Sequence, residues 1–109
     1  MKELEVAIKS LEEHKAENIV SIDVSKVNPF VSTLVLATCL NTRALGAMAE
    51  LLDDAFEKNK IEVRVKEGNP ISGWMIVEAG DVIVHLLLES NRKELNLEEL
   101  MDRLNFKNK

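Results

Sequence analysis

The chain has 109 residues, of which 46% are hydrophobic and 30% are charged. This length and apolar content predict one globular domain spanning residues 1–109 and exclude an intrinsically disordered chain. The formal net charge of −5 disfavours a phosphate backbone as the main binding partner, because such binding needs lysine and arginine side chains. A basic protein partner fits this charge better.

The same composition bears on where the protein works. Its single cysteine, Cys39, excludes an internal disulfide and fits a reducing compartment. The longest apolar runs fall far short of the roughly 20 residues that a membrane span needs. Acidic residues close to the N-terminus argue against a signal or transit peptide. We therefore expect a cytoplasmic protein that does not bind a membrane.

The first half of the chain predicts two helices and two strands. Apolar residues recur at helical spacing over residues 3–14. Residues 18–25 are rich in Ile and Val and predict a strand that is mostly buried, and the continuous apolar run 33–39 predicts an interior strand. Asn41 can cap a helix that continues to about residue 59.

The second half predicts three strands and a helix. The six residues from Ile61 to Lys66 alternate, so the three apolar side chains are expected inward and the three charged ones outward. Two further strands flank a tight turn at residues 79–81. A capping-box-like start predicts a helix over residues 96–104, and residues 105–109 form a polar tail. The element order predicts an α/β or α+β fold in which helices cover a mixed sheet.

The segment SGWMIVEAGDVIVHLLLES, residues 72–90, holds the chain's only tryptophan. The two-residue period of a strand places Trp74 and Glu78 on one face. Glu78 and Asp81 flank the glycine turn, so both carboxylates are expected near one edge and within reach of Trp74. An aromatic anchor with a carboxylate rim suits a partner rich in arginine and lysine. The alternative is that Trp74 packs in the core and both carboxylates are solvated.

Together with the loop before it, this segment resembles the ribosomal silencing factor family (RsfS, also called Iojap-like). The shared pattern is an E-G loop, a tryptophan at the head of a strand, a G-D turn, V-V-H, and then R and L-E-x-L. Its positions here are Glu67, Gly68, Trp74, Gly80, Asp81, Val82, Val84, His85, Arg92, Leu97, Glu98 and Leu100. The resemblance implies a nucleotidyltransferase-like α/β fold, with a mixed five-stranded sheet flanked by helices.

The resemblance also implies a function without catalysis. Such proteins bind a basic ribosomal protein of the large subunit where the small subunit would dock, block subunit joining and so repress translation. The partner-binding residues expected from it are Trp74, Glu78, Asp81, Glu67, Gly68 and Met75, and the structural ones are His85, Gly80 and Arg92. No cofactor, no metal and little direct nucleic-acid binding are expected, and a homodimer is left open.

This chain departs from the usual family pattern at several positions. Glu78 replaces an aspartate, Glu94 and Leu95 replace an aromatic pair, and Met101 replaces a tryptophan. The contacts made by those aromatic residues are therefore not carried over to this chain.

Other candidate sites are weak. His85 lies on an apolar strand and is expected to be a structural histidine, and no second histidine or cysteine falls at metal-ligand spacing. Nucleotidyl transfer needs paired carboxylates that hold Mg²⁺, whereas Asp23 stands alone in its strand. A vestigial nucleotide-binding protein centred on Asp23 is the alternative function. Cys39 ends an apolar strand and is expected to pack as a small hydrophobe.

Overall fold

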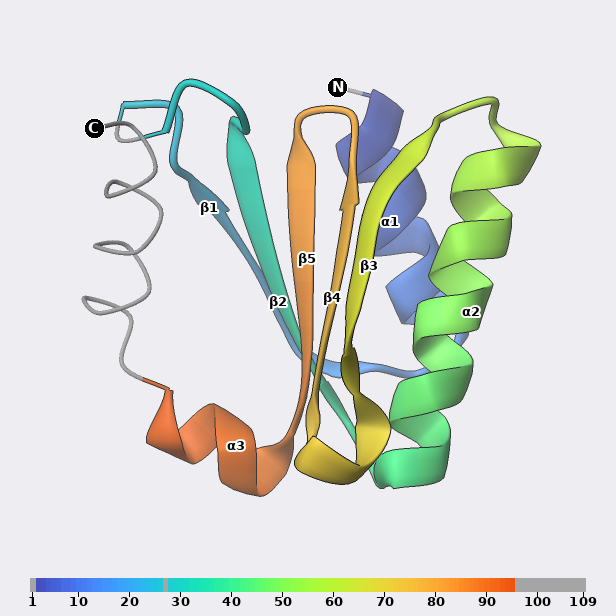
Figure 1. Ribbon diagram of the computed structural model, residues 1–109, viewed down its shortest axis with the longest axis vertical. Helices are drawn as coiled ribbons and strands as arrows, with labels where there is room; N and C mark the ends of the chain where they lie inside the picture. Colours follow the sequence, from blue (N-terminus) through green and yellow to red (C-terminus); the bar gives the residue numbers. More distant parts are fainter. Residues whose placement is uncertain (1, 27, 96–109) are drawn as a thin grey trace.

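The computed structural model describes residues 2–26 and 28–95, which form a five-stranded sheet with helices packed against it (Figure 1). The elements are α1 (Lys2–Glu13), β1 (Glu17–Asp23), β2 (Thr33–Cys39), α2 (Thr42–Lys58), β3 (Val63–Asn69), the 3-10 helix η1 (Pro70–Ser72), β4 (Trp74–Ala79), β5 (Val82–Leu88) and α3 (Glu89–Glu94). The helix expected over residues 96–104 and the tail after it lie outside the described residues. No helix in the described ranges has the length and apolarity to cross a membrane.

The strand order is β1-β2-β5-β4-β3, which confirms the mixed five-stranded sheet. β2 and β5 pair in parallel at the centre, and the other three pairs are antiparallel. Every residue of β2 is buried, as expected for a parallel strand covered on both faces. The predicted interior strand at residues 33–39 is therefore confirmed.

The two long helices lie on the same side of the sheet (Figure 1). The main apolar core lies between them and the sheet, and Leu45, Leu52 and Phe56 of α2 are fully buried in it. The side-chain oxygen of Asn41 accepts a hydrogen bond from the backbone N–H of Ala44 at 2.8 Å, which confirms the predicted helix cap. A smaller apolar cluster occupies the opposite face of the sheet, which we call the far face.

The prediction that the first strand is mostly buried was wrong. β1 is an edge strand, and five of its seven residues are exposed. Its Ile19 packs against the main core and its Ile22 against the smaller cluster. Content of Ile and Val could not distinguish a central strand from this edge strand.

The expected alternation in the third strand holds only in part, because the strand contains a bulge. Val63 pairs with Ala79, whereas Val65 pairs with Glu78, so the register shifts between the two valines. A bulge of this kind changes which face the following side chains occupy. Lys66 consequently faces α2, where its amino group contacts the carboxylates of Glu50 at 2.8 Å and Asp53 at 3.2 Å.

The sequence pattern missed α3, a six-residue helix that directly follows β5. Arg92 of this helix donates a hydrogen bond from Nη1 to Oγ1 of Thr38 in β2 at 3.1 Å. Burial lowers the pKa of the Arg92 guanidinium. This contact ties α3 to the carboxyl end of β2.

Candidate partner-binding surface

Alternate residues of β4 divide the candidate site between the two faces of the sheet. Trp74, Ile76 and Glu78 are half-buried and lie on the far face. Met75 lies on the other face, where it is buried in the main core against the helices. The structure thus removes Met75 from the surface that a partner could reach, which corrects its assignment as a partner-binding residue.

Trp74 is held by the histidine on the neighbouring strand. Its indole Nε1–H donates a hydrogen bond to Nδ1 of His85 at 2.8 Å, and the two ring centroids are 5.5 Å apart. Ile76 is the direct partner of His85 across the strands, so Trp74 is its diagonal neighbour on the same face. Trp74 is therefore neither wholly core nor freely exposed, and its hydrogen-bond partner His85 is only 3% exposed.

Glu67 is the carboxylate that lies beside Trp74. It pairs across β3 and β4 with Ile76 and is exposed, which places it diagonally next to the tryptophan. Gly68 follows with φ of 111°, and a Cβ there would collide with the carbonyl oxygen of Trp74. Gly68 is thus required by the close approach of the two strands. We call the surface formed by Val65, Glu67, Trp74, Ile76 and Glu78 the β3–β4 face.

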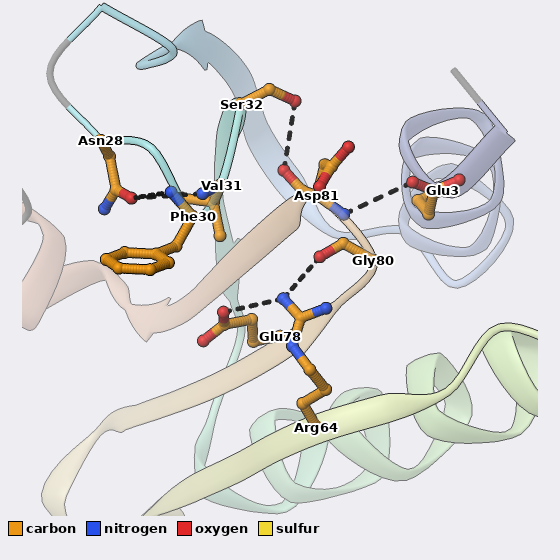
Figure 2. A network of polar contacts seen from close by, with 9 residues as sticks. All are labelled: Glu3, Asn28, Phe30, Val31, Ser32, Arg64, Glu78, Gly80 and Asp81. Carbon is orange, nitrogen blue, oxygen red and sulfur yellow. Dashed lines mark hydrogen bonds and ion pairs between the residues drawn. The ribbon is translucent and has the colours of Figure 1, made fainter.

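Glu78 is already engaged by a cation from the neighbouring strand. Nη2 of Arg64 contacts Oε1 of Glu78 at 2.9 Å and also donates to the carbonyl oxygen of Gly80 (Figure 2). The Glu78 side chain is 17% exposed, against 44% for that of Arg64. A partly exposed pair of this kind contributes about 0–1 kcal/mol to stability. No sequence pattern predicts this pairing, because it depends on the register shift between Val63 and Val65 in β3.

Asp81 lies at the far end of β4 from Trp74. Trp74 pairs with Leu87 and Ala79 with Val82, so the whole length of the strand separates the tryptophan from the turn. The expectation that both carboxylates lie within reach of Trp74 was therefore wrong. Gly80 adopts φ of 56° and makes the turn. The Asp81 carbonyl oxygen accepts the backbone N–H of Ser32 at 2.8 Å.

The alternative sites gain no support. Oδ1 of Asp23 accepts hydrogen bonds from the Ser25 hydroxyl at 2.6 Å and from its backbone N–H at 2.9 Å, and these bonds lower the pKa of Asp23. Burial raises the pKa of the Cys39 thiol to about 11, so it is a poor nucleophile at neutral pH. Within the described residues, no group of three or more His, Cys, Asp or Glu side chains is placed to hold a metal ion.

Comparison with known proteins identifies the family. The family model described as "Ribosomal silencing factor during starvation" matches residues 1–108. A ribosomal silencing factor RsfS from Chromobacterium violaceum is 30% identical over 95 residues, or 87% of this chain and 78% of the relative. The mouse protein named "Mitochondrial assembly of ribosomal large subunit protein 1" is 26% identical over 107 residues, which is 95% of this chain and 47% of the mouse protein.

Comparison with solved structures agrees with this family assignment. A crystal structure of a Chromobacterium violaceum protein matches this one with a TM-score of 0.84 at 28% identity, covering 93% of this chain and 84% of that one. The chain belongs to the ribosomal silencing factor family. The resemblance that rested on the E-G loop, Trp74 and the G-D turn is therefore confirmed.

Proposed function

We propose that this chain binds a basic protein of the large ribosomal subunit where the small subunit docks, and that it represses translation by blocking subunit joining. Membership of the ribosomal silencing factor family, over residues 1–108, carries the proposal. The name of the mouse relative refers to the large subunit and supports that choice of subunit. Blocking requires only that the bound protein occupy the place where the small subunit docks, so no catalytic step is needed. We place this action in the cytoplasm, a reducing compartment compatible with the free thiol of Cys39.

The β3–β4 face supports this proposal as a contact surface. It combines the half-buried ring of Trp74 with the exposed carboxylate of Glu67. A large aromatic side chain held in one orientation loses little conformational entropy on binding, and a neighbouring carboxylate can pair with a basic residue of the partner. The formal net charge of −5 favours encounter with a basic surface. Gly68 contributes by allowing β3 to approach β4 closely beneath this surface.

Sedimentation tests the proposal directly. The purified protein is mixed with separated large subunits, small subunits and assembled ribosomes, and each mixture is resolved on a sucrose gradient. We expect the protein to sediment with free large subunits and to be nearly absent from small subunits and assembled ribosomes. Adding it before the two subunits are mixed should lower the yield of assembled ribosomes. Equal recovery with both kinds of subunit would contradict the blocking mechanism.

A further inference from the structure

A groove lies between α1 and α2, on the opposite side of the sheet from the β3–β4 face. It consists of two hollows of about 440 Å³ each, and they adjoin, because Glu13, His14 and Leu51 line both of them. Nδ1 of His14 donates to the carbonyl oxygen of Ser10 at 2.8 Å, which holds the ring against α1. Hollows of roughly 300–1,000 Å³ are the size that small molecules occupy in proteins. The groove is therefore large enough to hold a small ligand.

One of the two hollows, beside the start of α2, is mainly apolar. Its lining includes Cys39, Ala44, Ala47, Met48 and Leu51. The two alanines carry short side chains, which leave room beside the helix. Leu40 lines the same hollow and is 86% exposed, so an apolar group bound here would cover it, and burying apolar surface is favourable. This hollow therefore suits an aliphatic or aromatic part of a ligand.

The adjoining hollow, which we call the polar hollow, contains a buried hydroxyl without a partner. Ser10 lines this hollow and is 5% exposed, and its Oγ makes no hydrogen bond within the described residues. A serine inside a helix can bond the carbonyl oxygen four residues earlier, and this one does not. An unpaired buried hydroxyl costs free energy, and few buried polar groups in proteins are left in that state. Because the hydroxyl turns about a single side-chain bond, it can meet an acceptor that enters the hollow.

The polar hollow carries charges of both signs. Two lysines and two carboxylates line it, namely Lys9, Lys58, Glu13 and Asp54. Lys9 and Glu13 are 3.9 Å apart and both are largely exposed, so their pairing is weak, and no salt bridge among the described residues engages Lys58. Glu13 follows Ser10 by three positions, so the two side chains project from the same face of α1, and Lys58 reaches the hollow from α2. A ligand here can therefore meet an acid and a hydroxyl from one helix and a base from the other.

We propose that this groove binds a free apolar amino acid in its zwitterionic form. The carboxylate of the ligand pairs with Lys58 and accepts the Ser10 hydroxyl, its ammonium group pairs with Glu13, and its side chain extends past Leu51 into the apolar hollow. Lys58 and Leu51 lie about two turns apart in α2, or roughly 10 Å, so one molecule the size of leucine can touch both side chains. A zwitterion has no net charge, which suits a hollow lined by equal numbers of lysines and carboxylates. Because the groove lies across the sheet from the β3–β4 face, this inference is independent of the proposed function.

Titration of the isotope-labelled chain with L-leucine, followed by nuclear magnetic resonance, tests this binding. We expect the backbone amide signals of Ser10, Glu13 and Leu51 to shift in a saturable way, with a Kd of about 1 mM or tighter. Three relatives of leucine each lack one part: isocaproate lacks the ammonium group, leucinamide lacks the carboxylate and glycine lacks the apolar side chain. Each should bind about tenfold more weakly, because it leaves one part of the site without its partner. The inference is wrong if leucine gives no saturable shifts in the groove, or if any of these relatives binds there as tightly as leucine.

Variants of the lining residues locate the ligand. Lys58→Gln and Glu13→Gln should each weaken leucine binding about fivefold or more. The matched controls Lys2→Gln and Glu12→Gln, which are exposed on α1 and line neither hollow, should leave it unchanged. Ser10→Ala should weaken binding without lowering the melting midpoint, because it removes a hydroxyl that has no partner in the free chain. Normal binding in all three lining variants, or equal losses in the controls, would overturn the inference.

Two further measurements separate a free amino acid from other occupants of the groove. In N-acetylleucinamide both charges are capped, so this molecule imitates a segment of polypeptide, and we expect it to bind far more weakly than leucine. An affinity equal to that of leucine would assign the groove to a peptide and overturn the inference. The groove signals of the ligand-free chain should not change with protein concentration. A concentration-dependent shift of those signals would assign the groove to a second copy of this chain and overturn the inference as well.

Discussion

The indole Nε1–H of Trp74 donates to Nδ1 of His85 at 2.8 Å, so a half-buried ring on β4 is oriented by a buried ring on β5. Because an indole N–H can only donate, Nδ1 of His85 must accept, which assigns the ring proton of the neutral imidazole to Nε2. The rings are tilted by 44° with centroids 5.5 Å apart. The hydrogen bond thus couples the orientation of the proposed contact residue to a buried side chain.

We expect His85→Ala to destabilise the fold and to release the Trp74 ring. The substitution removes the acceptor of a part-buried hydrogen bond and leaves a small cavity, a loss of about 1–3 kcal/mol in the free energy of unfolding. Thermal denaturation should show a melting midpoint lower by several degrees. The emission of Trp74, the only tryptophan, should shift to longer wavelength as its ring becomes more exposed. Unchanged emission in a variant of unchanged stability would contradict the coupling.

Trp74→Ala should weaken binding to large subunits by about 2 kcal/mol or more, the scale of an interface hot spot. Its effect on the free energy of unfolding should be smaller than the roughly 3–5 kcal/mol of a fully buried tryptophan deletion, because the ring is half-buried. Sedimentation and chemical denaturation measure the two quantities separately. A large loss of stability with normal binding would mean that Trp74 serves only the core.

Reversing the charge of Glu67 tests the electrostatic part of the same surface. Glu67→Lys should weaken binding, because it sets a cation against a basic partner beside Trp74. Asp54→Lys is the matched control, since Asp54 is an exposed acid on α2, on the other side of the sheet. The loss in Glu67→Lys should diminish as salt is raised, because exposed charges are screened. Equal losses in the two variants would indicate an effect of net charge alone.

Gly68→Ala should destabilise the fold far more than Gly46→Ala. Residue 68 has φ of 111°, and an added Cβ would collide with the Trp74 backbone, so we expect a loss of roughly 1–3 kcal/mol or more. In α2, a Cβ at residue 46 would lie 3.3 Å from Cγ of Pro70, and the helix gains about 1 kcal/mol from alanine. The two effects at residue 46 should largely cancel. Urea denaturation of both variants measures the difference.

Sequence periodicity predicted much of this fold because several elements carry strong local signals. The run from Thr33 to Cys39 is apolar throughout, and the helix after Asn41 has both a cap and a continuous apolar stripe. Each of these signals, the burial of a strand and the capping of a helix, can be recognised within a short stretch of sequence. They therefore gave the bounds of β2 and α2 closely.

The features of the fold that sequence patterns did not predict depend on contacts between residues that are far apart in the chain. The bulge in β3 changes the facing of Val65 and Lys66, and the exposure of β1 follows from its place at the sheet edge. The pairing of Arg64 with Glu78 follows from that same bulge. The 64% exposure of Phe30 depends on the hydrogen bonds that Asn28 accepts in the same loop and on the packing of Val31. A hydrophobic side chain in a loop has no local signal that distinguishes an exposed ring from a buried one.

Asp23→Asn should leave binding to large subunits unchanged. The Asp23 carboxylate is exposed at the end of an edge strand and is bonded to Ser25 of the same turn. The substitution removes a local turn contact without opening the core. Titration of the wild-type protein with nucleoside triphosphate and Mg²⁺ should give no binding heat above dilution. A metal-dependent turnover of nucleotide that Asp23→Asn abolishes would overturn the proposal of a non-catalytic protein.

Cys39 should make the stability fall at alkaline pH. Burial raises the pKa of its thiol in the folded state to about 11, whereas the unfolded thiol keeps a value near 8.5. Below about pH 8.5 both states hold the proton, so the contribution to stability is complete. As the pH rises from there towards about 11, the unfolded state releases its proton and the folded state retains it, so unfolding becomes more favourable.

The expected decline is at most about 1.4 kcal/mol per pH unit for a single thiol. Lys66 contributes in a similar direction at still higher pH, because hydrogen bonds to Glu50 and then Asp53 raise the pKa of its amino group. Cys39→Ala therefore provides the necessary comparison: urea denaturation at pH 7, 8.5, 9.5 and 10.5 should show a shallower decline in the variant than in the wild type. Parallel declines in the two proteins would mean that the thiol titrates equally in both states, and its burial would then have no effect on the alkaline stability.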